Sequence, residues 1–202
     1  MKELWDFDKS ICPNGILAGI DEAGRGPLAG PVVSAVAILK KNIIIENLND
    51  SKKLSPSMRL SVYKQIIENC IEYQVGIVEH STIDRINILE ATKLSMKIAV
   101  EKLVSQPELV IIDGNQPIDI KTKQKTIISG DAKSASIAAA SVIAKVTRDL
   151  MMEEFDKKYP NYGFAKHKGY GTKSHISAIK KFGPCEIHRR SFEPVKSYDP
   201  IS

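Results

Sequence analysis

Four carboxylates end or directly follow short apolar segments of the chain. Asp21 and Glu22 close the first segment, Asp113 closes the second, and Asp131 follows the third. Functional groups of α/β sheets gather at strand ends, and carboxylates that meet there repel one another unless cations neutralise them. Mg²⁺ or Mn²⁺ takes oxygen ligands, and two such ions ~3.5–4 Å apart suit phosphodiester hydrolysis. The pattern predicts a two-ion centre, although each acid alone also fits a turn or a helix cap.

A glycine loop follows the first two acids. Gly24 and Gly26 would let the main chain approach a ligand closely, and Arg25 between them carries a planar cationic fork. Because the loop begins two residues beyond Glu22, we expect its main chain to contact a sugar or a phosphate beside the metal site. A tight turn without a ligand is the alternative.

The excess positive charge lies at the C-terminal end of the chain. The sequence contains 29 Lys and Arg against 24 Asp and Glu, which gives a net charge of +5. Residues 160–202 hold eight of the basic residues and only three of the acids, so the rest of the chain is balanced. A basic segment on a neutral body predicts nucleic acid as the partner, although a solvated surface has the same composition. We therefore expect a catalytic core at 1–159 and a basic substrate-binding segment at 160–202 packed on it.

Five further side chains are candidates for contacts with that nucleic acid. Tyr170 stands among lysines and glycines and is expected to stack on, or hydrogen-bond to, a nucleotide. Lys168 in the same run, Arg189 and Arg190 in a second basic run, and Lys53 in a polar loop are expected on phosphates. Each of them also fits an ordinary solvated surface.

The strand and helix patterns place these residues at the edges of a layered α/β domain. Runs of β-branched residues predict strands at 15–21, 32–39, 73–78, 109–113 and 125–129. Helical periodicity and cap residues predict helices at 55–70, 81–104 with a break near Asn87, 134–158 and 173–182. Strands mixed with helices favour an α/β fold with a small helical basic C-terminal appendage.

Several classes of protein are excluded by composition. An odd number of widely spaced cysteines builds neither a disulfide framework nor a zinc knuckle, and His167, His175 and His188 lack the spacing of a metal site. The acidic N-terminus does not fit a signal peptide, and no apolar run is long enough to span a membrane. We expect a cytoplasmic protein with free thiols, no membrane partner and a monomeric state.

Five motifs in one chain resemble bacterial ribonuclease HII, a type 2 ribonuclease H. They are GIDEAGRGPLAGPVV at 19–33, NDSKKL at 49–54, IIDG at 111–114, GDAKSASIAAASVIAKVTRD at 130–149, and HKGYGT at 167–172. The resemblance extends from about residue 14 to residue 195. It implies an RNase H-like fold with a central mixed sheet flanked by helices.

The resemblance also implies an activity and a set of site residues. Ribonuclease HII cleaves the RNA strand of RNA–DNA hybrids and incises 5′ of single ribonucleotides in duplex DNA, leaving 3′-hydroxyl and 5′-phosphate ends. Its metal-binding acids match Asp21, Glu22, Asp113 and Asp131. The loop that contacts the ribose 2′-OH matches residues 24–26, and the tyrosine that senses the RNA–DNA junction matches Tyr170.

Two other functions compete with this one. The first is a different two-metal nuclease of the same fold, such as a resolvase or recombinase, which would act on all-DNA junctions. The second is a nucleic-acid-binding domain without activity, which would have no need for four mutually repulsive acids.

Overall fold

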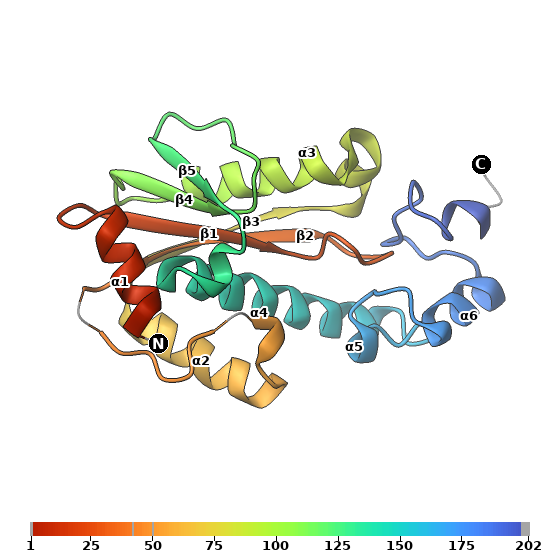
Figure 1. Cartoon of the computed structure of the whole chain (residues 1–202). Helices are drawn as coiled ribbons and strands as arrows, with labels where there is room; N and C mark the ends of the chain where they lie inside the picture. Colours follow the sequence, from red (N-terminus) through yellow and green to blue (C-terminus); the bar gives the residue numbers. More distant parts are fainter. Residues whose placement is uncertain (1, 42, 50, 199–202) are drawn as a thin grey trace.

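The computed structural model describes residues 2–41, 43–49 and 51–198. A mixed sheet of five strands forms its centre, in the order β3-β2-β1-β4-β5 (Figure 1). β1 pairs antiparallel with β2 and parallel with β4, β3 is antiparallel to β2, and β5 is parallel to β4. The middle strand β1 therefore has one parallel and one antiparallel neighbour.

The elements follow the chain in a mixed order. The strands are β1 (Leu17–Ala23), β2 (Val32–Leu39), β3 (Cys70–Val78), β4 (Leu109–Asp113) and β5 (Gln124–Ile127). The helices are α1 (Lys2–Ile11), α2 (Pro56–Asn69), α3 (His80–Glu101), α4 (Ala135–Lys158), α5 (Phe164–His167) and α6 (Lys173–Phe182).

Helices cover both faces of the sheet. α4 packs on β1 and β2 together with α1 and α2, and α3 packs against β2 and β3 on the opposite face (Figure 1). A side chain at Gly19 of β1 would collide with the main chain of Ser136 in α4. The glycine and the buried alanines that begin α4 thus allow helix and strand to lie unusually close.

The C-terminal part of the chain lies beyond one end of the sheet, where α5 packs against α4, and α6 and the last turns lie further out (Figure 1). A bridge between Ala29 and His188 joins it to the β1–β2 connection. The main-chain amides of Arg190 and Ser191 donate to the Asp84 carboxylate of α3 at 2.9 Å each. The segment is therefore attached to both the loop and the helix layer.

The structure confirms the α/β architecture expected from the sequence. It places a kink at Asn87, where φ is 67°, inside α3. Two helices, α1 and α5, had no counterpart among the sequence predictions. No described helix is both long and apolar enough to cross a membrane. Residue 50 of the polar loop and residues 199–202 of the basic segment lie outside the described residues.

Candidate active site

Three acids from separate parts of the chain meet at one end of the sheet. Asp21 and Asp113 follow Ile20 and Ile112, which pair with each other in the parallel strands β1 and β4. Asp131 lies in a short 3₁₀ helix after β5. One carboxylate oxygen of each acid lies within 4.8 Å of the other two. The parallel pairing brings the first two carboxylates together, and the turn after β5 supplies the third.

Local hydrogen bonds set the orientation of these acids. The Gly130 amide donates to Asp113 Oδ1 at 2.6 Å, which ties the turn carrying Asp131 to the end of β4. The Ser141 hydroxyl on α4 hydrogen-bonds to Asp21 and lies 2.9 Å from the Ser51 hydroxyl. Helix α4 and the polar loop at 51–53 thus both support the acid of β1.

The acids share a buried environment in which like charges face one another. Asp21 is 4% exposed and Asp131 is 7% exposed. Burial raises the pKa of Asp21 well above its usual value, and the neighbouring Glu22 and Asp113 raise it further. Burial also raises the pKa of Glu22, while the Arg25 guanidinium opposes that shift. Carboxylates this close together can all be ionised only if bound cations offset the repulsion between them.

The donor set fits hard divalent cations. All the candidate ligands are carboxylate oxygens, which Mg²⁺ and Mn²⁺ prefer. Asp21, Asp113 and Asp131 are close enough to share an ion, and Glu22 interacts with the same group through Asp113. We call these four residues the acid cluster.

The glycine loop lies directly beside the acid cluster. Gly24 has a φ of +98°, a conformation that side chains rarely adopt. The Arg25 guanidinium reaches Glu22 Oε1 at 3.4 Å and is half exposed. A Cβ atom added to Gly26 would lie 3.7 Å from the ring of Tyr170. The open main chain at Gly26 and the tyrosine ring therefore face the same space.

Tyr170 is presented by a compact turn. Its side chain is 46% exposed. Its amide donates to the His167 carbonyl at 2.9 Å, and its own carbonyl lies 2.9 Å from His175 Nδ1. The Leu28 amide donates to the Gly169 carbonyl at 2.8 Å. The tyrosine turn is therefore hydrogen-bonded to the β1–β2 connection that contains the glycine loop, although the two are distant in sequence.

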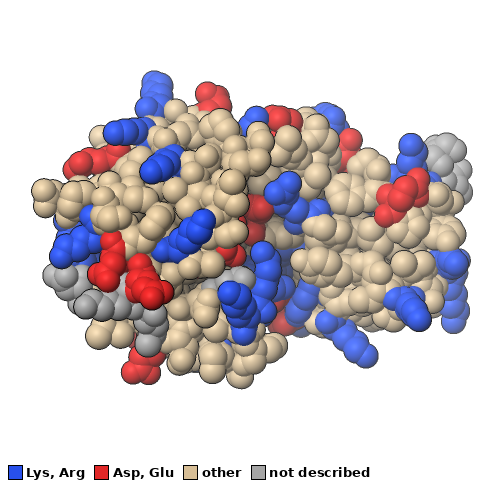
Figure 2. All heavy atoms as spheres, in the orientation of Figure 1, with Lys and Arg blue, Asp and Glu red and all other residues tan. Residues whose placement is uncertain are grey.

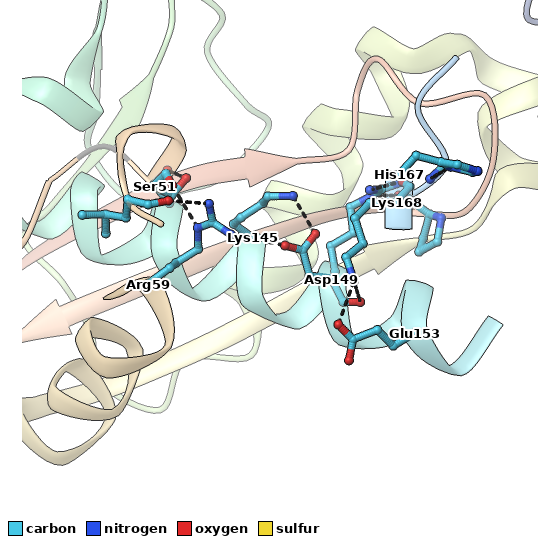
Figure 3. A network of polar contacts seen from close by, with 12 residues as sticks. Ser51, Arg59, Lys145, Asp149, Glu153, His167 and Lys168 are labelled. Carbon is cyan, nitrogen blue, oxygen red and sulfur yellow. Dashed lines mark hydrogen bonds and ion pairs between the residues drawn. The ribbon is translucent and has the colours of Figure 1, made fainter. Parts of the chain in front are cut away.

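Two of the basic residues expected on phosphates have partners inside the protein. Arg189 is fully buried and donates to main-chain carbonyls, so the expectation of a surface phosphate contact is wrong for this side chain. Burial is possible because the glycine loop offers several carbonyls in one place. The Lys168 ammonium forms an ion pair with Glu153 at 2.7 Å (Figure 3). Arg190 and Lys53 are exposed, and Lys53 lines a hollow next to Ala132.

The polar loop at 51–53 brings a further cation near the acid cluster. Lys52, next to Lys53, lowers the pKa of Glu22 and so has its charge near the acid cluster. Arg59 Nε donates to the Ser51 carbonyl at 2.9 Å, while its guanidinium lies 3.5 Å from Asp149 (Figure 3). The sequence shows that the loop is basic. Only the folded structure, in which Arg59 holds the loop, decides which of its lysines lies near the acids.

Three histidines that are far apart in sequence gather behind the tyrosine turn. His175 Nε2 lies 3.0 Å from His188 Nε2, and the rings of His167 and His175 stack at 4.4 Å. Among the described residues, the acids alone form a group with metal-ligating geometry. The histidines pack against Phe164 and support the turn that carries Tyr170.

Basic side chains are not confined to the C-terminal segment. Figure 2 shows Lys and Arg over both the sheet body and the C-terminal part of this face, with acidic atoms set back near its centre. An acidic hollow with a basic rim is the charge pattern of a site that takes cations together with a polyanion.

The sequence matches the family profile of ribonuclease HII over residues 18–195. The chain belongs to the ribonuclease HII family. Ribonuclease HII of Acetivibrio thermocellus is 55% identical over 192 residues, which are 94% of this chain and 75% of that relative. Ribonuclease HII of Bacillus licheniformis is 52% identical over 205 residues, which are 98% of this chain and 80% of that relative.

Solved structures agree with this assignment. The ribonuclease H2 of Pyrococcus horikoshii OT3 superposes with a TM-score of 0.76 at 28% identity, covering 91% of this chain and 97% of that one. Ribonuclease HII in the PCNA complex from Archaeoglobus fulgidus superposes with a TM-score of 0.75 at 26% identity, covering 88% and 95%. The fold is RNase H-like, and the chain is a type 2 ribonuclease H, an endonuclease acting on RNA–DNA hybrids.

Proposed function

We propose that this ribonuclease HII both cleaves the RNA strand of hybrids and incises duplex DNA 5′ of a single embedded ribonucleotide. The observation that carries the second activity is the position of Tyr170 against Gly26, next to the acid cluster. The 2′-hydroxyl is the group that distinguishes RNA from DNA. Main-chain groups at residues 24–26 would contact that hydroxyl, while the tyrosine ring would rest on the neighbouring deoxyribose.

The proposed chemistry is hydrolysis of one phosphodiester bond. Two divalent cations, Mg²⁺ or Mn²⁺, held by the acid cluster would lower the pKa of the attacking water and stabilise the leaving oxygen. Water attacks phosphorus and the bond to the 3′-oxygen breaks, which leaves a 3′-hydroxyl and a 5′-phosphate. The carboxylates of Asp21, Asp113 and Asp131 are close enough together that they would hold this positive charge in place. Gly130 orients Asp113, and Ser141 orients Asp21.

Exposed cations beside the site would hold the rest of the duplex. Lys53, Arg190 and the half-exposed Arg25 have side chains that reach solvent on the described surface. Residues 160–202 add further exposed lysines, including Lys166, Lys173, Lys180 and Lys181. Binding through such contacts would weaken steeply with salt.

We also propose a cytoplasmic location, since Cys12, Cys70 and Cys185 are free thiols.

A cleavage assay on duplex DNA with one ribonucleotide tests the proposal. We expect incision 5′ of the ribonucleotide with Mg²⁺ or Mn²⁺, none with a chelator, and none on the matched all-DNA duplex. Cleavage of an all-DNA four-way junction would instead favour a resolvase. Binding without metal-dependent hydrolysis would favour the inactive binding domain.

Tyr170→Ala examines the junction-sensing role. Removing a stacking side chain forfeits about 1–3 kcal/mol, so single-ribonucleotide incision should fall by roughly 5- to 150-fold. Cleavage of a long hybrid should fall less, because consecutive ribonucleotides offer many productive positions. Tyr170→Phe, which keeps the ring, should retain most of the activity on both substrates. An equal loss on the two substrates in Tyr170→Ala would refute the junction role.

A further inference from the structure

Two fully buried arginines lie behind the loops that would read the ribonucleotide. Arg148 of α4 is 1% exposed and Arg189 of the C-terminal segment is 0% exposed. Burial lowers the pKa of Arg148 to about 10 and that of Arg189 to about 9. Both guanidinium groups therefore stay charged near neutral pH. A buried charge persists only where polar groups surround it.

Main-chain carbonyls provide that surrounding. Arg189 donates to the carbonyls of Gly24 at 2.6 Å, Arg25 at 2.9 Å and Gly30 at 3.0 Å. It also reaches the carbonyl of Pro31 at 3.2 Å. The one guanidinium thereby binds both ends of the β1–β2 connection. It fixes the carbonyls of Gly24 and Arg25 in the glycine loop, while Arg25 and Gly26 remain exposed to solvent.

Arg148 extends the same connection to the tyrosine turn. It donates to the carbonyls of Ala29 at 3.0 Å, Pro31 at 3.0 Å and Lys168 at 2.9 Å. The Pro31 carbonyl is thus shared by the two arginines. Lys168 is two residues before Tyr170. The glycine loop and the tyrosine turn are both bound to one pair of guanidinium groups, which we call the arginine pair.

The arginine pair is also linked to the acid cluster through α4. Arg148 is seven residues, or about two helical turns, beyond Ser141, which hydrogen-bonds to Asp21. The helix therefore sets the distance between the reacting phosphate and the sugar-reading loops. A guanidinium has several donors in a fixed planar arrangement, whereas an ammonium is a compact charge on a flexible stem. Lysine would keep the charge here and lose most of the carbonyl contacts.

We propose that Arg148 and Arg189 are positioning residues for ribonucleotide selection. They hold the main chain of residues 24–26 and the Tyr170 ring at a fixed separation, so that the 2′-hydroxyl and the adjoining deoxyribose are read in one step. This inference rests on the proposed incision at single ribonucleotides. Both side chains are buried and donate to main-chain carbonyls rather than to the acid cluster, so their influence falls on selection rather than on hydrolysis.

The substrates should respond differently when this spacing is loosened. A single ribonucleotide can be cleaved in only one position on the enzyme, so every displacement from that position lowers the rate of cleavage. A long hybrid has a 2′-hydroxyl at each step and tolerates small displacements. Arg189→Lys and Arg148→Lys should therefore lower kcat/KM for the single ribonucleotide on the order of tenfold more than kcat/KM for the hybrid. The Mg²⁺ concentration for half-maximal rate should stay unchanged, because the acid cluster is intact.

Arg59→Lys is the matched control. Arg59 also donates to main-chain carbonyls, those of Ser51 and Leu54 at 2.9 Å each, but it holds the loop at 51–53. This variant should lower activity on both substrates by the same factor. Thermal unfolding of each variant identifies any that fails to fold, and Arg148→Lys and Arg189→Lys test the same prediction independently of each other.

The outcomes separate the two proposals. Wild-type enzyme that does not incise at a single ribonucleotide overturns the proposed function and the selective role together. Wild-type enzyme that incises, with folded arginine variants that keep the wild-type substrate ratio, overturns only the positioning role. A changed ratio in Arg59→Lys equal to that in the arginine variants would also overturn it, because the effect would then be general.

Discussion

The acid cluster and the arginine pair both bury charge, and they do so in opposite ways. In the acid cluster, Asp21, Asp113 and Asp131 turn like charges toward one another, and burial and repulsion raise the pKa of Asp21. In the arginine pair, each cation lies among main-chain carbonyls that accept its hydrogen bonds. The acids face like charges, whereas the arginines face the neutral carbonyls that accept their hydrogen bonds.

The difference separates a site from its support. A group of carboxylates that repel one another gains from a divalent cation that enters, so it binds ligands. A buried guanidinium that donates to carbonyls of several segments instead fixes those segments relative to one another. The family resemblance names the first region, whereas the second is visible only in the folded structure.

Among the changes that test this difference between the acid cluster and the arginine pair, removal of divalent cations should have the largest effect. With a chelator, cleavage of an RNA–DNA hybrid should stop completely. Mg²⁺ or Mn²⁺ should raise the melting temperature of the wild type, because ligands that bind only the native state stabilise it by about 2.7 kcal/mol at a hundred times Kd. Differential scanning calorimetry with and without the metals measures this shift. A melting temperature indifferent to both ions would contradict the assignment of the acid cluster.

The second-largest effect is expected for the substitution Asp113→Asn. The amide keeps an oxygen that can accept from Gly130 N but loses the charge, so the local structure survives and the metal site does not. We expect cleavage to fall by roughly a thousandfold, comparable with loss of a preorganised electrostatic group. Binding to the hybrid should change little. In the absence of metal, the free energy of unfolding should not be lower than that of the wild type. Near-normal turnover would refute the role of this acid.

Arg189→Ala should show the reverse behaviour. Several buried carbonyls would lose their donor, and an unsatisfied buried polar group costs about 1–3 kcal/mol. Denaturant unfolding should show a loss of about 3 kcal/mol that is the same with and without Mg²⁺. Asp113→Asn serves as the comparison, since its stability should lose its dependence on metal. An Arg189→Ala protein as stable as the wild type would remove the contrast between the regions.

The smallest effect concerns acid pH. Burial lowers the pKa of His175 to about 4 and that of His188 to about 3. An unfolded histidine titrates near 6.5, so between about pH 6.5 and 4 the unfolded chain takes up protons that the native state refuses. The free energy of unfolding should then fall by about 1.4 kcal/mol per pH unit for each such proton.

Comparison with His175→Gln isolates this contribution. Burial also raises the pKa of Asp21. This shift changes the free energy of unfolding in the opposite direction, because the native state takes up that proton before the unfolded chain as the pH falls. Urea unfolding of the wild type and of His175→Gln from pH 7.5 to 4.5 should therefore give curves that converge toward acid pH. Parallel curves would show that His175 does not titrate differently in the native and unfolded states.

Local signals in the sequence were sufficient for most elements. The β-branched run at 32–39 is strand β2, and Ser55-Pro56 begins helix α2, whose cap hydroxyl accepts from Met58. The break expected near Asn87 is a kink with positive φ. These features depend on residues close together in the chain, which is why periodicity and caps predict them. α1 lacks such a cap signal, and α5 is a single turn fixed by its surroundings.

The sequence by itself determined the family, the α/β fold and the acids that end its strands, because motif and strand pattern are properties of short segments. Only the tertiary structure decided what happens to the basic residues. Arg189 and Arg190 are adjacent, yet one is buried against carbonyls as many as 165 residues away and the other is exposed. Whether a charge is satisfied inside the protein depends on which main-chain groups converge on it, and that convergence exists only once distant segments have packed together.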